Sequence, residues 1–199
     1  MDTTRPSLLI RIRDRSDEAA WRAFDAIYRP MLLRFAKAHH LPDAEAEDVA
    51  QHCLSAFIRK LDEFEYDRGR GRFKGWLRTL VNNRVRNLWR DRRNVAALNG
   101  TDELTPDLQE QPDQAFERIW MEEHLWHCLR ELQTEVDPGT FAAYEAYVLK
   151  QEPAEQICAR LGISRGNLHT IKWRLTERVA VKMRELLGEH EQDEIILPD

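Results

Sequence analysis

The sequence predicts an all-α protein with two small helical domains joined by an acidic linker. Apolar residues recur at three- and four-residue steps through most of the 199 residues, and no segment shows the alternation typical of strands. The stretch 95–115 contains glycine and proline, lacks a helical period and separates two helical blocks. The expected domains are therefore 1–94 and 116–188, followed by an acidic tail at 189–199.

The first block is expected to open with two long helices and a loop. Ser16 or Asp17 can cap the first helix, which ends before Pro42. Asp43 is expected at the N-cap of the second helix, whose first turn carries acids where the helix dipole favours them. The stretch EFEYDRGRGRFKG (63–75) holds three glycines and is expected to be a loop.

The segment FKGWLRTLVNNRVRNLWRDRR (73–93), whose first three residues lie in that loop, is expected to continue as an amphipathic helix. One face should enter the core through Leu77, Leu80, Val81, Val85 and Leu88. The opposite face should carry Arg78, Asn82, Arg86, Arg90 and Arg93. Trp76 and Trp89 bracket this face, and aromatic and amide groups beside guanidinium groups can hold unpaired bases. The helix is therefore expected to handle DNA whose strands are being separated.

The charge distribution supports nucleic acid as a partner. The net charge is −5, yet ten Lys or Arg and a single acid lie between Arg68 and Arg93. A second basic stretch, from Lys150 to Arg184, holds eight bases and three acids. The linker holds five acids and no Lys or Arg. Two basic blocks with acidic neighbours indicate two surfaces for polyanions.

Residues 154–173, AEQICARLGISRGNLHTIKW, have the pattern of a helix-turn-helix. Gly162 permits a tight turn, Cys158 lets two helices cross closely, and Ser164 can cap the second helix. A plain helical hairpin is the alternative. Outward positions on the second helix would face a major groove: Arg165, Asn167, His169, Thr170, Lys172 and Trp173. An aromatic residue at this position more often packs within the protein than contacts bases, so Trp173 is expected to pack.

Several classes of protein are disfavoured by the composition. No apolar run approaches the roughly 18 residues of a membrane span, and the N-terminus lacks the features of a signal peptide, so a cytoplasmic protein is expected. Cys53, Cys128 and Cys158 lie far apart, which indicates neither a disulfide framework nor a zinc site. No catalytic residue, metal or cofactor is expected.

The chain resembles bacterial RNA polymerase sigma factors of the extracytoplasmic-function (ECF) group. AEDVAQHCLSAFIRKLDEF (46–64) is similar to their core-polymerase-binding helix, and GRFKGWLRTLVNNRVRNLWRDRR (71–93) to their promoter-melting helix. Residues 129–187 resemble their carboxy-terminal domain. The resemblance implies a sigma region 2-like domain at 1–94 and a region 4-like domain at 116–188, with a function in promoter recognition and melting.

The resemblance also implies partners and site residues. The partners are core RNA polymerase, through its clamp helices and flap, and promoter DNA, with an anti-sigma protein as a further candidate. The face for the clamp helices would hold Asp48, Gln51, His52, Ser55 and Arg59. Minus-ten DNA would meet Arg72, Lys74, Trp76, Arg78, Asn82, Asn83, Arg84, Arg86 and Arg90, with the loop from Phe64 to Arg72 capturing a flipped base. Minus-thirty-five DNA would meet Ser164, Arg165, Asn167, His169, Thr170, Lys172 and Arg174.

This sequence departs from the family pattern at several positions. His52 stands where an acid is common, and Asn87 where Asp is common. His169-Thr170-Ile171 replaces a frequent Lys-Ser-Arg, which leaves the base-reading residues open. Lys172 and Arg174 are candidates to supply the missing cations one turn on.

Two other readings remain. A helix-turn-helix regulator that is not a polymerase subunit accounts for residues 154–173 but not for the first basic block. A recombinase or nuclease would need a metal held by Glu63, Glu65 and Asp67, which lie in a loop without a supporting cluster.

Overall fold

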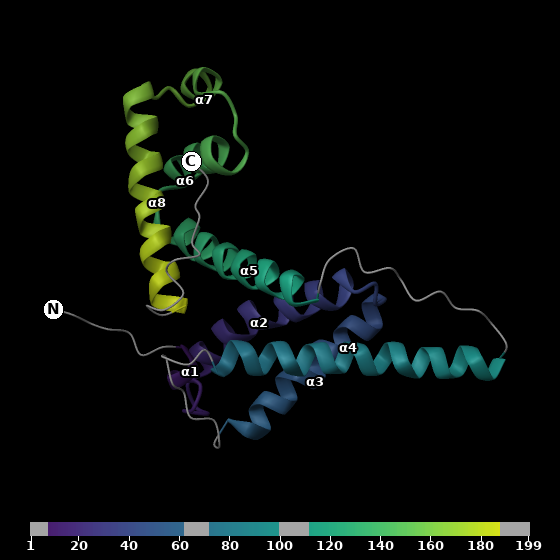
Figure 1. Ribbon diagram of the computed structural model, residues 1–199. Coiled ribbons are helices and arrows are strands. Elements are labelled where there is room, and N and C mark those ends of the chain that lie inside the picture. The colour runs from purple at the N-terminus through teal and green to yellow at the C-terminus, as the bar shows by residue number, and fades with distance from the viewer. Residues whose placement is uncertain (1–7, 62–71, 100–111, 188–199) are drawn as a thin grey trace. The chain divides into compact units, whose positions relative to one another are not determined.

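The computed structural model describes residues 8–61, 72–99 and 112–187. Every regular element in these ranges is a helix, which confirms the all-α prediction (Figure 1). Contacts divide the chain into unit 1, Met1–Glu123, and unit 2, His124–Asp199. The functional domain boundaries remain predictions. The acidic tail at 189–199 lies outside the described residues.

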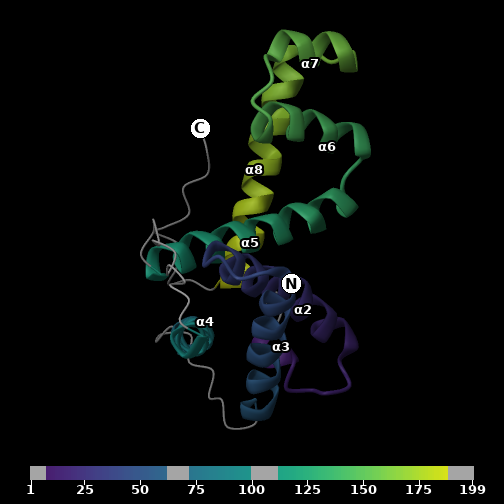
Figure 2. The ribbon, with the colours of Figure 1, turned by 90° about the vertical axis from the view of Figure 1, so that its right-hand side faces the viewer.

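Unit 1 is built on three long helices. Its elements are α1 (Leu8–Arg11), α2 (Glu18–Ala38), α3 (Asp43–Lys60), α4 (Arg72–Asn99) and the first half of α5 (Pro112–Glu135). α2 packs along α3, and α4 contacts both of them. Figure 2 views α4 nearly end-on, with α3 beside it. The three predicted helices of the first block are therefore present.

Of the two expected caps, Ser16 and Asp17, Asp17 is the one that caps the start of α2. Its Oδ1 accepts a hydrogen bond from the Ala20 amide at 2.9 Å. The Arg11 guanidinium donates to both oxygens of the same carboxyl, at 3.0 and 3.1 Å, so α1 is tied to the start of α2. The amide hydrogen bond from Ala20 is the largest cause of the lowered pKa of Asp17. The Asp17 carboxyl therefore stays ionised at pH values well below 7.

A tight turn joins α2 to α3. His40 has a φ of 59°, in the left-handed region, and the Leu41 amide donates to the carbonyl of Ala36 at 3.2 Å. Pro42 occupies the N-cap position of α3. The expected N-cap, Asp43, is instead the first helical residue, because extended backbone at the proline completes the turn one position earlier.

An aromatic cluster forms the core of unit 1. The rings of Phe24 and Phe57 stack at 5.0 Å, and Phe73 meets Phe57 at 5.0 Å and Tyr28 at 5.1 Å. Trp120 of α5 adds a contact to Tyr28 at 5.7 Å. Each of these side chains is buried, and aromatic burial dominates core energetics, so α2, α3, α4 and the start of α5 share one core.

Helix α4 is longer than the sequence pattern predicted. Residues 72–75, expected in a loop, are helical, because Phe73 enters the core and offsets the cost of about 1 kcal/mol for a glycine inside a helix. Residues 95–99 and 112–115, expected in the linker, are also helical. Ala96 and Ala115 are buried, and such contacts extend both helices past the expected ends.

Unit 2 contains the second half of α5 and four further elements: α6 (Pro138–Tyr144), η2 (Glu145–Leu149), α7 (Ala154–Leu161) and α8 (Arg165–Leu187). Gly162 ends α7 with a φ of 65°, a conformation that glycine adopts without strain. Ser164 Oγ accepts a hydrogen bond from the Asn167 amide at 3.1 Å, as expected of a cap on α8. Ile157, Leu168 and further apolar side chains are buried between α6, α7 and α8.

Ion pairs join α5 to α8 within unit 2. Lys182 Nζ lies 3.2 Å from a Glu131 oxygen and 2.7 Å from a Glu135 oxygen. Arg178 adds a contact to Glu135 at 2.8 Å. The hydrogen bond from His127, followed by those from Lys182, lowers the pKa of Glu131 to about 2. Ionised Glu131 therefore stabilises the packing of α5 on α8.

The three cysteines differ in accessibility. Cys53 in unit 1 and Cys128 in unit 2 expose 0% and 1% of their surface. Burial raises the pKa of each thiol to about 12. Cys158 on α7 is half-buried. All three are free thiols.

Two negative findings apply to the described ranges alone. No helix there has the length and apolar character needed to cross a membrane. No group of three His, Cys, Asp or Glu is placed there to hold a metal ion. The alternative metal ligands Glu63, Glu65 and Asp67 lie outside these ranges, as do the loop from Phe64 to Gly71 and four of the five linker acids.

Candidate functional site

The five residues expected to bind a protein partner share one face of α3. Gln51, His52, Ser55 and Arg59 lie three, four, seven and eleven residues after Asp48 on α3, which places all five on one side of the helix. Ser55 is half-buried and the other four are exposed. The structure therefore brings them together on an accessible surface, here called the α3 face.

A hollow of about 250 Å³ adjoins this face, between α2 and α3. Gln51, Ser55 and Ile58 line it from α3, and Trp21, Asp25 and Arg29 from α2, together with Phe24 and Leu54. Sequence reasoning missed the α2 contribution. The available signal was the four-residue spacing of Trp21, Asp25 and Arg29, which puts an aromatic group and two opposite charges on one side of the helix.

His52 is surrounded by positive charge. Partial burial, followed by the charges of Arg84 and Arg59, lowers the pKa of His52. The imidazole is therefore neutral near pH 7 and presents hydrogen-bonding nitrogens rather than a cation. Arg84 comes from α4, so the expected protein-binding and DNA-binding sets approach each other at this point.

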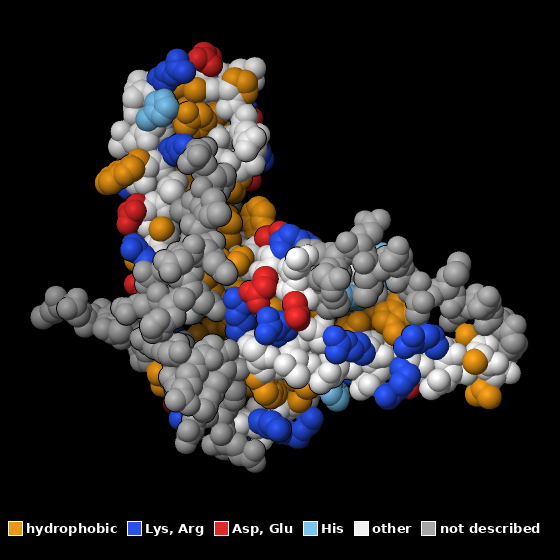
Figure 3. All heavy atoms as spheres, in the orientation of Figure 1, with side chains coloured by type: hydrophobic (Ala, Val, Ile, Leu, Met, Phe, Trp, Pro, Cys, Tyr) orange, Lys and Arg blue, Asp and Glu red, His pale blue; other side chains and the backbone are white. Residues whose placement is uncertain are grey.

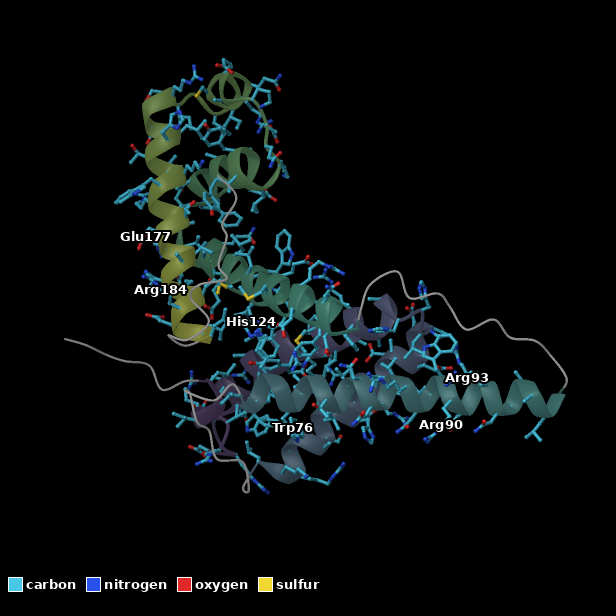
Figure 4. The ribbon with its side chains drawn as sticks, in the orientation of Figure 1. Trp76, Arg90, Arg93, His124, Glu177 and Arg184 are labelled. Carbon is cyan, nitrogen blue, oxygen red and sulfur yellow. The ribbon has the colours of Figure 1, made fainter. Side chains whose placement is uncertain are left out.

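The basic residues of α4 fall into two groups. Arg86, Arg90 and Arg93 are exposed, as is the uncharged Asn83, and neither Arg86 nor Arg93 takes part in an ion pair within the described ranges. Arg90 and Arg93 lie toward the C-terminal end of the helix and Trp76 toward its start (Figure 4). Figure 3 shows Lys and Arg side chains spaced along α4. This second half of α4 is therefore an open basic surface in the described part of unit 1.

The first half of α4 is less accessible than expected. Asn82, placed on the outer face by its spacing, exposes only 8% of its surface. It lies three residues before buried Val85, so the core reaches this edge of the helix. Trp76 is half-buried, with its ring 5.7 Å from Phe57 and 6.4 Å from Phe73, so it is partly a packing residue. Arg72 begins α4, and its side chain is outside the described part of the chain.

Acids from α5 cover two of the expected DNA contacts. Lys74 Nζ lies 2.7 Å from Glu117, and Arg78 donates to Glu117 at 3.2 Å. Asp113 lies 3.8 Å from Arg78. Sequence reasoning missed Glu117, because only the folded chain brings residue 117 to the start of α4. These contacts partly neutralise the basic face.

Trp89 is a structural residue rather than a platform for bases. Its Nε1 donates a hydrogen bond to the carbonyl of His39 at 3.1 Å. The guanidinium of Arg92 lies 4.7 Å from the ring centroid and also contacts Glu45 at 2.6 Å. One face of the indole is therefore covered within the protein, contrary to the expectation that Trp89 frames a site for bases.

Helix α8 presents the expected DNA-binding residues on its outer side. Arg165, Asn167, His169, Thr170 and Arg174 are exposed, and Lys172 is half-buried. Ser164 is exposed and acts as the cap described above. The His169 ring meets Tyr147 edge-on at 5.6 Å, so η2 helps to hold it.

Some of the outer side of α8 is occupied by internal contacts. Arg165 lies 3.2 Å from Glu155, and Thr170 Oγ1 bonds the carbonyl of Gly166 at 3.0 Å. Farther along α8, Arg184 contacts Glu177 at 3.3 Å (Figure 4). Trp173 exposes 72% of its surface, so the expectation that it packs inside the chain is wrong.

Residues 26–95 match the family model described as Sigma-70 region 2. The match spans most of α2, all of α3 and α4 as far as Val95, and so includes the α3 face and the basic face of α4. No curated protein matches the chain, and neither does any solved structure. The part of the chain that carries these two faces is thus similar to Sigma-70 region 2.

Proposed function

We propose that this protein is an ECF-type sigma factor, a cytoplasmic, non-enzymatic subunit that directs core RNA polymerase to promoters. The match of residues 26–95 to Sigma-70 region 2 carries the proposal. It covers two surfaces of different chemistry, a mixed polar face on α3 and a basic face on α4. A sigma factor needs both, because it must hold polymerase and DNA at once.

The α3 face is proposed to bind the clamp helices of the polymerase. Exposed Asp48 and Arg59 offer opposite charges at either end of the face, and the hollow beside Gln51 offers a recess with an apolar floor of Phe24, Leu54 and Ile58 among polar side chains. Interfaces with a small apolar centre and a polar rim are typical of subunits that associate reversibly.

The two basic surfaces are proposed to bind different parts of the promoter. Exposed Arg86 and Arg90 on α4 would hold the phosphates of the opened minus-ten strand. The Gly162 turn and the Ser164 cap on α8 support a helix-turn-helix, in which Asn167 and His169 near the start of α8 would face the minus-thirty-five bases. Only residues 100–111 separate α4 from α5. This short linker supports the ECF group, whose two regions are joined directly by a linker.

Run-off transcription tests this function. Purified protein and core RNA polymerase, combined on genomic fragments, should yield transcripts from discrete start points that are absent with either component alone. The protein should also co-purify with core. A helix-turn-helix regulator would bind duplex DNA without associating with core, and a nuclease or recombinase would cut or join DNA. No specific transcript in the presence of active core would contradict the proposal.

A further inference from the structure

The start of α5 sets two carboxylates against the basic face of α4. Glu117 Oε2 lies 2.7 Å from Lys74 Nζ, and Glu117 Oε1 accepts a hydrogen bond from Arg78 Nη1 at 3.2 Å. Asp113 places a second carboxylate 3.8 Å from Arg78 Nε. Lys74 and Arg78 are one turn apart on the same face of α4, so a single glutamate bridges both cations.

These contacts occupy donors that a phosphate would need. The Lys74 side chain exposes 16% of its surface and its ammonium lies 5.6 Å from the centroid of the Trp120 ring. The Arg78 side chain exposes 38%. Phosphate and carboxylate oxygens accept charge-assisted hydrogen bonds of the same length, about 2.7–2.9 Å. A phosphate that binds Lys74 or Arg78 therefore competes with Glu117 for the same cations.

Apolar contacts keep α5 in this position independently of the charges. The Phe116 ring meets Phe35 at 5.8 Å, and the Trp120 ring meets Tyr28 at 5.7 Å. Glu117 is carried between these two buried aromatic residues. Its placement on α4 therefore follows from core packing, and a neutral residue at 117 would leave α5 docked.

We propose that Glu117, assisted by Asp113, competes with the phosphates of single-stranded nucleic acid for Lys74 and Arg78. The inference rests on the proposed function, since it takes α4 to be the strand-binding helix. Partly exposed ion pairs are individually weak, so the competition lowers affinity several-fold rather than abolishing binding. In the free protein the open half of α4, with Arg86 and Arg90, binds first, and the masked half follows when Glu117 is displaced.

A matched control lies one and a half turns farther along α5. Glu122 contacts Arg34 of α2 and Arg118 of its own helix. Glu122→Gln removes the same charge from the same helix without touching α4. Comparison with Glu117→Gln therefore separates local competition from a general loss of negative charge.

The test measures binding of the full chain to a mixed-sequence single-stranded oligonucleotide by fluorescence anisotropy over a range of salt concentrations. Glu117→Gln should raise affinity about 3- to 10-fold at low salt. It should also steepen the slope of log K against log salt by about 0.7 for each additional phosphate that the protein neutralises. Lys74→Ala combined with Arg78→Ala, introduced into the Glu117→Gln protein, should cancel both changes, while Glu122→Gln should match the original protein. Circular dichroism checks that each variant keeps its helices.

The possible outcomes distinguish a failure of the proposed competition by Glu117 from a failure of the proposed function. If Glu117→Gln leaves binding unchanged while Lys74→Ala with Arg78→Ala weakens it, the two cations bind nucleic acid and the competition is wrong. An equal gain for Glu117→Gln and Glu122→Gln would also overturn the competition. A third outcome is that binding is unchanged in Glu117→Gln, in Lys74→Ala with Arg78→Ala, and in Arg86→Ala with Arg90→Ala. In that case α4 does not bind single-stranded nucleic acid, and the proposed function is wrong.

Discussion

Asp48 lies on the exposed α3 face, where a change of charge is tolerated by the fold. Asp48→Arg should abolish co-purification with core polymerase, because reversing one charge in a complementary interface brings like charges together. Its circular dichroism spectrum should be unchanged. Asp91→Arg, on the exposed side of α4, makes the same charge change away from the α3 face and should still co-purify. Retention of Asp48→Arg on core would contradict the proposed docking face.

Glu131 makes the stability of unit 2 depend on pH in the acid range. Its folded-state pKa is about 2, below the roughly 4.3 of an exposed glutamate. Ionised Glu131 therefore stabilises the fold at pH values above 4.3, and the contribution is lost as the pH falls toward 2.

The measurement is acid unfolding followed by circular dichroism. Glu131→Gln should be less stable than the original chain at pH 7, and the difference should shrink between pH 4 and 2. Glu185→Gln, an exposed change on α8, should follow the original acid profile. A stability difference for Glu131→Gln that stays constant down to pH 2 would rule out this linkage.

At the scale of the element, α8 divides its tasks along its length. Asn167 and His169 lie in its first turns, where a recognition helix meets base edges, and Lys172 follows one turn on. Asn167→Ala or His169→Ala should change which upstream sequence is preferred, at about 1–3 kcal/mol for each bidentate hydrogen-bonded pair with a base that the substitution removes. Lys172→Ala should instead weaken all sequences about equally, as expected of a residue that binds phosphate.

Selection of upstream elements from a randomised duplex library measures this difference. The original chain, assembled with core polymerase, supplies the reference preference. Should the Asn167 and His169 variants select the same element as the original chain, base reading lies elsewhere, and exposed Arg174 and Trp173 become the next candidates.

Local patterns predicted the helices because burial on one face leaves a periodic trace in the sequence. The spacing of Leu77, Val81 and Val85 identified the buried side of α4, and Gly162 with Ser164 identified the turn before α8. Both signals come from residues close in sequence. The extents of α4 and α5 were less predictable, because contacts of Phe73 and Ala115 with the core decided where the helices end.

The candidate site was predictable as a set of residues but not as a surface. The resemblance to a known family supplied the five polar residues of α3, and the structure places them on one face of the helix. The bridge from Glu117 to Lys74 and Arg78 joins positions far apart in the chain, and no local pattern reports it. Asn82 was predicted on the exposed face of α4 but is buried. It lies at the edge of the buried face, where helical periodicity alone does not distinguish a buried position from an exposed one. Long-range packing decided these cases.

At the scale of the whole molecule, α5 belongs to both units. Its residues up to Glu123 pack with unit 1 and those from His124 onward with unit 2. Phe116 and Trp120 enter the first core, while Cys128 and Leu132 are buried in the second. The helix therefore contributes to two separate hydrophobic cores, each with its own stabilising contacts.

The reactivity of the cysteines with a thiol reagent can report on the two cores separately. Reaction with a thiol reagent requires an accessible thiolate. Half-buried Cys158 should label readily in the native protein, whereas Cys53 and Cys128 should label only when their own core opens. Labelling rates resolved by peptide mass spectrometry would then follow each core separately. Rapid modification of all three cysteines in buffer would contradict the burial described above.

A reporter group on Cys158 would consequently sit on α7, beside the turn that leads into α8, with no engineered cysteine needed. Protection of Cys53 would meanwhile follow unit 1 in the same sample, and protection of Cys128 would follow unit 2. Added polymerase that docks on the α3 face should slow labelling of Cys53, which lies on the same helix, by stabilising the closed state of its core. One unmodified chain thus carries a built-in set of footprinting probes, each assigned to a different part of the protein.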